Sequence, residues 1–164
     1  MALIVLMISS LGLFAAPEVI IPTKEEAKLE IARAKEILDR YGVSHSADPE
    51  KPIDWASYLE KAQDRLGKSG SGQRTGSIRL TDSYPIKKTI YFDSHVTLEG
   101  SVRAKHHIGS SHGFVAEEGF KGDTVLVWKI PKPKVYYSNF GAGIYQIHVQ
   151  SRKGINGVSF RGAQ

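Results

Sequence analysis

The sequence predicts a mainly-β fold that follows two N-terminal helices, and three observations support this class. Apolar residues recur at helical spacing as far as Leu66 and at alternating, strand-like spacing from Gly76 onward. Glycines punctuate the second part, as is typical of turns between short strands. The length of 164 residues suits one domain. Helices followed only by short strands indicate a β-solenoid, a sandwich or a barrel behind a helical cap.

Composition and charge narrow the class of partner. The hydrophobic fraction of 41% and the charged fraction of 24% are ordinary for a globular protein and argue against disorder or a many-spanning membrane protein. The net charge of +5 favours partners that carry phosphate, carboxylate or sulfate, although such an excess also serves solubility alone. Because the chain has no cysteine, disulfides, zinc thiolates and thiol nucleophiles are excluded.

Residues 1–16 predict a signal peptide. The opening "MALIVLMISSLGLFAA" is almost wholly apolar, is too short for a stable membrane span, and ends in small residues before Pro17. We therefore expect a secreted or extracytoplasmic protein, in the periplasm or on the cell surface. No Lys or Arg precedes the apolar run, so an uncleaved lipid-facing anchor or a misassigned start is the alternative.

Residues 17–53 predict a helix and a loop. Thr23 and Glu26 form a T-x-x-E capping box, and Gly42 provides a left-handed stop. We expect the apolar stripe of this helix to pack on the domain or to link it to the envelope. Helix-mediated oligomerisation is the alternative, over only about two and a half heptads. The stripe consists of Ala27, Ile31, Ala34, Leu38 and Tyr41.

Residues 54–164 predict a second helix and then strands. Asp54 is an N-cap for a helix with Trp55, Leu59, Ala62 and Leu66 on one face. After it, apolar side chains alternate with polar ones in successive short runs and are expected to point inward. The inward residues are Ile78 and Leu80; Ile86, Ile90 and Phe92; Val96 and Leu98; Val125 and Val127; Tyr145, Ile147 and Val149; Val158 and Phe160.

The gap at Asp93 and Ser94 separates two of these runs. A two-residue hairpin would favour Asn-Gly or Asp-Gly there, and the sequence has neither. We therefore expect a corner between successive strands of a coiling chain.

Two stretches resemble a known family. "DWASYLEKAQDRLGKSGSGQRTGSIRLTDSYPIKKTIYFDSHVTLEGS" is similar to the N-terminal portion of the pectate-lyase-like proteins, the rhamnogalacturonase and pectate lyase superfamily, and "GIYQIHVQSRKGINGVSFRGAQ" looks like one solenoid rung. The resemblance implies that residues 54–164 are the capping helix and first turns of a right-handed parallel β-helix. Such a coil needs about three or more turns for stability, and this chain supplies two to three and halts at Gln164 straight after a strand, so we expect a fragment. The resemblance also implies that catalytic groups lie on later turns.

A candidate binding row follows from the alternation near the C-terminus. If Tyr145, Ile147 and Val149 point inward, the polar residues between them face out and are joined by two cations. Such a row could hold a sugar through hydrogen bonds and a uronate carboxylate through charge-assisted contacts. The alternative is simply the polar face of a strand. The row consists of Gln146, His148, Gln150, Arg152 and Lys153.

Other groups give weaker signals, and the catalytic residues stay unknown. His106, His107 and His112 lack an accompanying carboxylate, so no metal site is expected, although the resemblance allows Ca²⁺ in a longer form. The acids Asp93, Glu99, Glu117, Glu118 and Asp123 show no spacing that aligns two for glycoside hydrolysis. A lyase base could be Arg152 or Lys153, without specific support.

Nucleic acid is the competing partner for the positive charge. "WKIPKPKVYY" at residues 128–137 mixes aromatic and basic side chains, which suits stacked bases and sugar rings alike. Export argues against nucleic acid. The sequence therefore predicts an exported carbohydrate-active β-helix protein that binds or acts on an acidic, pectin-like polysaccharide, with lyase or glycoside hydrolase activity in the full-length form. The alternative is a noncatalytic carbohydrate-binding, adhesive or spike-like structural protein of undetermined oligomeric state.

Overall fold

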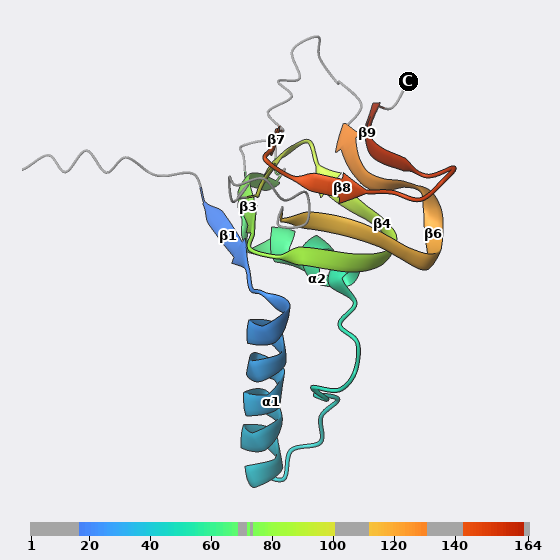
Figure 1. Ribbon diagram of the computed structural model, residues 1–164. Helices are drawn as coiled ribbons and strands as arrows, with labels where there is room; N and C mark the ends of the chain where they lie inside the picture. The colour runs from blue at the N-terminus through green and yellow to red at the C-terminus, as the bar shows by residue number, and fades with distance from the viewer. Residues whose placement is uncertain (1–16, 69–71, 73, 101–111, 131–142, 163–164) are drawn as a thin grey trace, which may run out of the picture.

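The structure is a computed structural model that describes residues 17–68, 72, 74–100, 112–130 and 143–162. It contains two sheets built mainly of parallel strands, with two helices beside them (Figure 1). The predicted mainly-β class with N-terminal helices is confirmed. The predictions for residues 1–16, for His106 and His107, and for residues 131–142 lie outside the described residues.

Each sheet collects strands that are far apart in the sequence. Sheet A contains β1 (Glu18–Ile21), β3 (Arg74–Leu80), β5 (His95–Glu99) and β7 (Ile144–Tyr145) in that spatial order, all parallel, with the short β2 (Gly67–Lys68) antiparallel to β3. Sheet B contains β4 (Ser83–Asp93), β6 (Gly113–Ile130), β8 (His148–Gln150) and β9 (Asn156–Gly162), and the last two pair with different halves of β6.

From β3 onward the chain alternates between the two sheets. β3 lies in sheet A, β4 in sheet B, β5 in sheet A and β6 in sheet B, and each pairs in parallel with the strand two steps along the chain. Parallel neighbours need a long crossover, and here a strand of the other sheet provides it. Asp93 and Ser94 therefore form a corner between sheets, as the sequence predicts.

The core lies between the sheets, where register partners stack in layers. Phe92 of β4 stacks on Trp128 of β6 with ring centroids 4.9 Å apart. The Trp128 indole Nε1 donates a hydrogen bond of 2.8 Å to the Val96 carbonyl and so links sheet B to sheet A. The inward residues expected on β3, β4 and β5 are confirmed as buried, namely Ile78, Leu80, Ile86, Ile90, Phe92, Val96 and Leu98.

Helix α2 (Trp55–Ala62) and the 3₁₀ turn η1 (Gln63–Arg65) close one end of this core. Asp54 is the N-cap, accepting a hydrogen bond of 3.1 Å from the Ser57 amide. The Trp55 ring lies 4.6 Å from that of Tyr84 on β4. The predicted helix face is confirmed, since its four apolar residues Trp55, Leu59, Ala62 and Leu66 are all buried.

Side chains of this helical segment hydrogen-bond the outer edge of β4, the edge strand of sheet B. The Gln63 amide donates to the Tyr91 carbonyl (2.7 Å) and accepts from the Asp93 amide (3.1 Å). The Glu60 carboxylate accepts from the Tyr91 amide (3.3 Å). Unpaired strand edges invite pairing with other chains, so these bonds protect the edge where another strand could add.

Helix α1 (Lys24–Arg40) begins as predicted, because Thr23 and Glu26 form the capping box and Gly42 has φ +65°. The expectation that its apolar stripe packs on the domain is wrong beyond the first turn. Among the described residues α1 buries only Ala27, and it points away from the sheets (Figure 1). The unpredicted strand β1 precedes α1 and pairs with β3, which joins residues 17–53 to the β structure.

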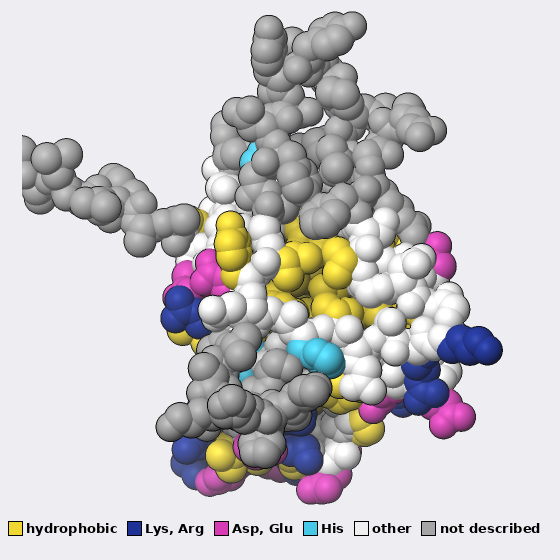
Figure 2. Space-filling view, turned by 45° about the horizontal axis from the view of Figure 1, so that its top comes forward, with side chains coloured by type: hydrophobic (Ala, Val, Ile, Leu, Met, Phe, Trp, Pro, Cys, Tyr) yellow, Lys and Arg dark blue, Asp and Glu magenta, His cyan; other side chains and the backbone are white. Residues whose placement is uncertain are grey.

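The C-terminal strands differ from prediction. The run expected from Tyr145 to Val149 is broken, because β7 belongs to sheet A and β8 to sheet B. Tyr145 is 61% exposed, so its expected inward position is wrong. At this end apolar side chains are less covered, with Val158 37% exposed, and Figure 2 shows hydrophobic atoms in view on this face.

Candidate functional site

The residues of the sequence-predicted row do not form one row. Val149 packs against the core, so its neighbours His148 and Gln150 face outward from β8. Gln146 lies between β7 and β8 with φ +53°, at the step from one sheet to the other. Lys153 follows β8 and is exposed. The structure therefore keeps His148 and Gln150 on one face and separates Gln146 from them.

Arg152 has a structural contact that accounts for part of its side chain. Its Nε donates a hydrogen bond of 3.2 Å to the Ala116 carbonyl of β6. β8 pairs with β6 as far as Val115, and β9 resumes the pairing only at Thr124. Arg152 thus satisfies a carbonyl in the gap between two strands, and its availability for a ligand is reduced.

Two hollows on the outside of sheet B gather more charge than the predicted row. The first, of about 590 Å³, lies between the α2–η1 segment and strands β4 and β6. The second, of about 810 Å³, lies between the start of α1, the segment before α2, and the same two strands. We call the first hollow the upper-strand groove and the second hollow the helix groove. Lys88 and Lys121 line both of them.

Lys88 and Lys121 are direct register partners on neighbouring strands. Like charges opposite each other across a strand pair are destabilising unless they are compensated. The charge of Lys88 is compensated by side chains of α2, because the Lys88 Nζ donates to Ser57 Oγ (2.7 Å) and lies 3.7 Å from a Glu60 carboxylate oxygen. The Asp54 carboxylate is also near, at 3.8 Å.

Asp54 is consequently held as an anion. Burial by itself would raise the pKa of this carboxyl, but hydrogen bonds from Ser57 and the charge of Lys88 bring the pKa below its ordinary value. A helix N-cap that stays ionised next to Lys88 both begins α2 and neutralises the lysine.

Lys121 and Lys129 are differently placed. Both are exposed, and no ion pair of either is found among the described residues. The Lys129 ammonium lies over the Tyr91 ring, 4.3 Å from its centroid. A cation on an aromatic face keeps its hydrogen-bond donors free for an anion. The upper-strand groove therefore offers two ammonium groups to a negatively charged ligand.

Arg74 closes the far side of the upper-strand groove and is already paired. Its guanidinium donates to the Asp93 carboxylate (3.0 Å) and to that of Asp64. These hydrogen bonds, with Asp64 first, raise the pKa of Arg74 further. Arg74 therefore links β3, η1 and the end of β4. The positive charge of the groove that has no ion pair among the described residues is that of Lys121 and Lys129.

The acidic side chains of the upper-strand groove are engaged with cations, and metal-ligating groups do not cluster among the described residues. No group of three metal-ligating side chains is found there. The two acids of the upper-strand groove, Glu60 and Asp93, are both ion-paired. None of the described helices combines the length and apolar content that crossing a bilayer requires.

Comparison with known proteins gives no relative: no family model, no curated protein and no solved structure matches the chain. The resemblance to pectate-lyase-like proteins therefore stays a prediction.

Sequence reasoning missed the lysine pair because its members lie 33 positions apart by number and meet only through the β4–β6 register. The alternation around Ile86 and Ile90 did contain a signal. Lys88 stands between two inward residues and interrupts the pattern. At the same place the strand register shifts, since β6 advances from Ala116 to Leu126 where β4 advances from Ile86 to Ile90.

Proposed function

We propose that this chain forms coils of an exported, right-handed parallel β-helix protein that binds an acidic polysaccharide along the outside of sheet B. The alternation between sheets and the parallel pairing support the coil. Parallel strands joined by a crossover are right-handed in almost all known cases, which supports the hand. The ligand lies in the upper-strand groove and continues into the helix groove.

The observation that carries this proposal is that the exposed ammonium groups of Lys121 and Lys129 line the upper-strand groove, while Lys121 also lines the helix groove. A repeating anion such as a polyuronate has one carboxylate on each sugar and can contact Lys121 and Lys129 at successive points. Charge-assisted hydrogen bonds to such carboxylates are stronger than those between neutral groups. Binding is favoured over turnover because Glu60 and Asp93 are engaged with cations.

The direct test is binding of the full chain to polygalacturonate by calorimetry. For Lys121→Gln and for Lys129→Gln we expect affinity to fall about two- to fivefold each, since an exposed ion pair contributes about 0.5 to 1 kcal/mol. Added salt should weaken wild-type binding through screening. Lys153→Gln, in the sequence-predicted row, is the matched control and should keep wild-type affinity.

Three results would contradict the proposal. They are equal binding to a neutral glycan, equal binding to single-stranded DNA, and unchanged affinity in both groove variants. If only Lys153→Gln weakens binding, the ligand lies at the row near β8 instead. Release of unsaturated product at ultraviolet wavelengths would place a lyase activity in this chain, and retention on the polymer without product supports the noncatalytic alternative.

A further inference from the structure

Helix α1 with the following Tyr41 forms an arm that stands off the β sheets, and we call residues 24–41 the α1 arm (Figure 1). The helix would be about 25 Å long at 1.5 Å per residue. Helices usually gain most of their stability from packing an apolar face, and in the described structure this one buries only Ala27. Most of the arm is therefore exposed, and the residues on its surface indicate which partner packs against it.

Local interactions keep the arm helical without such packing. The capping box of Thr23 and Glu26 satisfies amides of the first turn. Farther along, Lys35 and Asp39 form an ion pair of 2.5 Å, and Glu36 and Arg40 form one of 2.9 Å, both at i, i+4 spacing.

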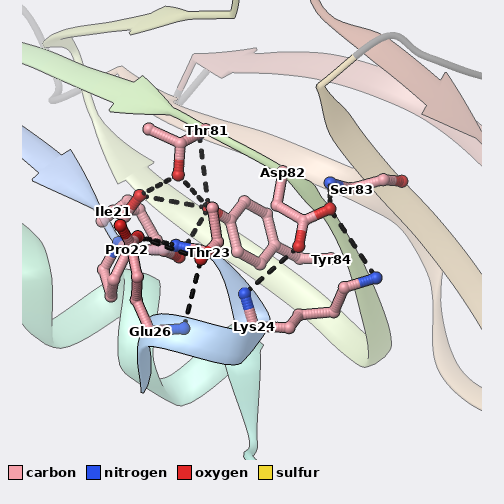
Figure 3. A network of polar contacts seen from close by, with 9 residues as sticks. All are labelled: Ile21, Pro22, Thr23, Lys24, Glu26, Thr81, Asp82, Ser83 and Tyr84. Atoms are coloured by element: carbon pink, nitrogen blue, oxygen red, sulfur yellow. Dashed lines mark hydrogen bonds and ion pairs between the residues drawn. The ribbon is translucent and has the colours of Figure 1, made fainter. Parts of the chain in front are cut away.

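A polar joint fixes the direction of the arm relative to the sheets (Figure 3). The Thr81 hydroxyl donates to the Ile21 carbonyl (2.6 Å), and the Tyr84 hydroxyl donates to the Pro22 carbonyl (2.9 Å). The Lys24 amide donates to the Asp82 carboxylate (3.2 Å). The β3–β4 turn and the start of β4 thus hold residues 21–24 by three separate contacts, so the arm has a fixed direction at its base.

The arm exposes an apolar ridge. Leu29 is 57% exposed, Ile37 is 52% exposed and Tyr41 is 76% exposed. With Arg33 they are spaced four residues apart, and side chains at this spacing form the ridges that pack between two helices. Such large apolar side chains gain free energy if a partner surface removes them from water.

The charges of the arm indicate which partner. The arm has five basic and five acidic residues and is neutral, whereas the whole chain is +5. From Lys24 to Glu30 it has two basic and three acidic residues, and from Arg33 to Arg40 three basic and two acidic. The two halves are therefore opposite in net charge. A second copy of the same helix, placed antiparallel, brings opposite halves and opposite helix-dipole ends together.

We propose that the α1 arms of two chains pack antiparallel on each other about a two-fold axis near Arg33, giving a homodimer through the arms. Leu29 of each copy then faces Ile37 of the other, and Glu26 lies opposite Arg40 of the other. Such a contact is isologous, so it closes at two copies. It leaves the upper-strand groove outside the interface, whereas the helix groove borders the arm at the start of α1.

The first test is the mass of the full chain in solution by sedimentation. We expect a concentration-dependent species of twice the monomer mass of 18.1 kDa. Leu29→Glu with Ile37→Glu should return it to the monomer mass. Ile20→Glu is the matched control, because Ile20 is 53% exposed but lies on β1 outside the ridge, and it should keep the dimer. A wild-type monomer, or a dimer that survives the double substitution, overturns the proposal.

The second test determines orientation and does not depend on loss of association. The chain has no cysteine, so a single introduced one is unique. Arg33→Cys should give a disulfide-linked dimer on oxidation. Glu25→Cys and Tyr41→Cys should each stay monomeric in a non-reducing gel when alone, and should crosslink when mixed. Self-crosslinking of Tyr41→Cys would show a parallel pair and overturn the antiparallel arrangement.

Discussion

At the scale of single residues, the Gln63 side chain hydrogen-bonds the edge of β4 in the way that a neighbouring strand would. Its side-chain amide has one donor and one acceptor aimed at the β4 edge, and it bonds the Tyr91 carbonyl and the Asp93 amide together. Gln63 is 3% exposed, so water cannot replace these bonds. An amide is the side-chain group that can serve both backbone partners at once, because a carboxylate offers no donor.

Gln63→Met should therefore destabilise the fold by about 1 to 3 kcal/mol, because it leaves two partly buried backbone groups unpaired at nearly constant volume. Urea unfolding measures the change. Lys61→Met, at an exposed position on the same helical segment, is the control and should be close to neutral. A loss equal to that of the control would show that the edge bonds contribute nothing to stability.

At the scale of elements, α1 depends on its cap more than on its contacts. The Glu26 carboxylate accepts hydrogen bonds from the Thr23 amide (2.8 Å) and hydroxyl (2.9 Å). These bonds, the backbone one first, hold the pKa of Glu26 below its ordinary value of 4.5. Since the pKa is lower in the folded state, the contribution of Glu26 to stability is complete above 4.5 and is lost as the pH falls through the lowered value.

Glu26→Ala should accordingly lower the helix content at neutral pH, and the difference from wild type should shrink as the pH falls below about 4.5. Circular dichroism across a pH series measures it. Glu25→Ala removes a first-turn acid that lies outside the capping box, so it should retain the acid-dependent loss of wild type. A difference between Glu26→Ala and wild type that stays constant down to pH 2 would contradict the role of the cap.

At the scale of the whole molecule, neighbouring strands are packed so closely that some positions have no room for a side chain. Gly113 is the register partner of His148, and a Cβ at residue 113 would overlap the His148 carbonyl. The layers differ in how well they are covered, because α2 buries Trp55 at one end while Val158 is 37% exposed at the other. Stability should thus be greatest near α2.

Gly113→Ala should cost about 1 to 3 kcal/mol because β8 must move away from β6 to accept the methyl group. Thermal unfolding measures the loss. Gly157→Ala is the matched control in β9: the nearest atom to its added Cβ is Val149 Cγ1 at 3.6 Å, which is ordinary contact. Equal melting temperatures for the two variants would show that β6 and β8 are not packed as closely as described.

Features that depend on neighbouring residues could be predicted from the amino-acid sequence. Caps at Thr23 and Asp54, the buried face of α2, the inward positions of β3 to β5 and the corner at Asp93 all follow from local hydrogen bonding or from alternation. Each of these is decided within a few residues of chain, so a single sequence contains the information.

Features that depend on distant partners required the three-dimensional structure. β1 is a strand because it pairs with β3, and Lys88 lies beside Lys121 because of the β4–β6 register. The row containing Gln146 is divided because β7 and β8 belong to different sheets. Strand pairing and the exposure of a helix such as α1 are set by surfaces contributed from elsewhere in the chain. The periodicity of a single segment does not indicate which surfaces will contact it.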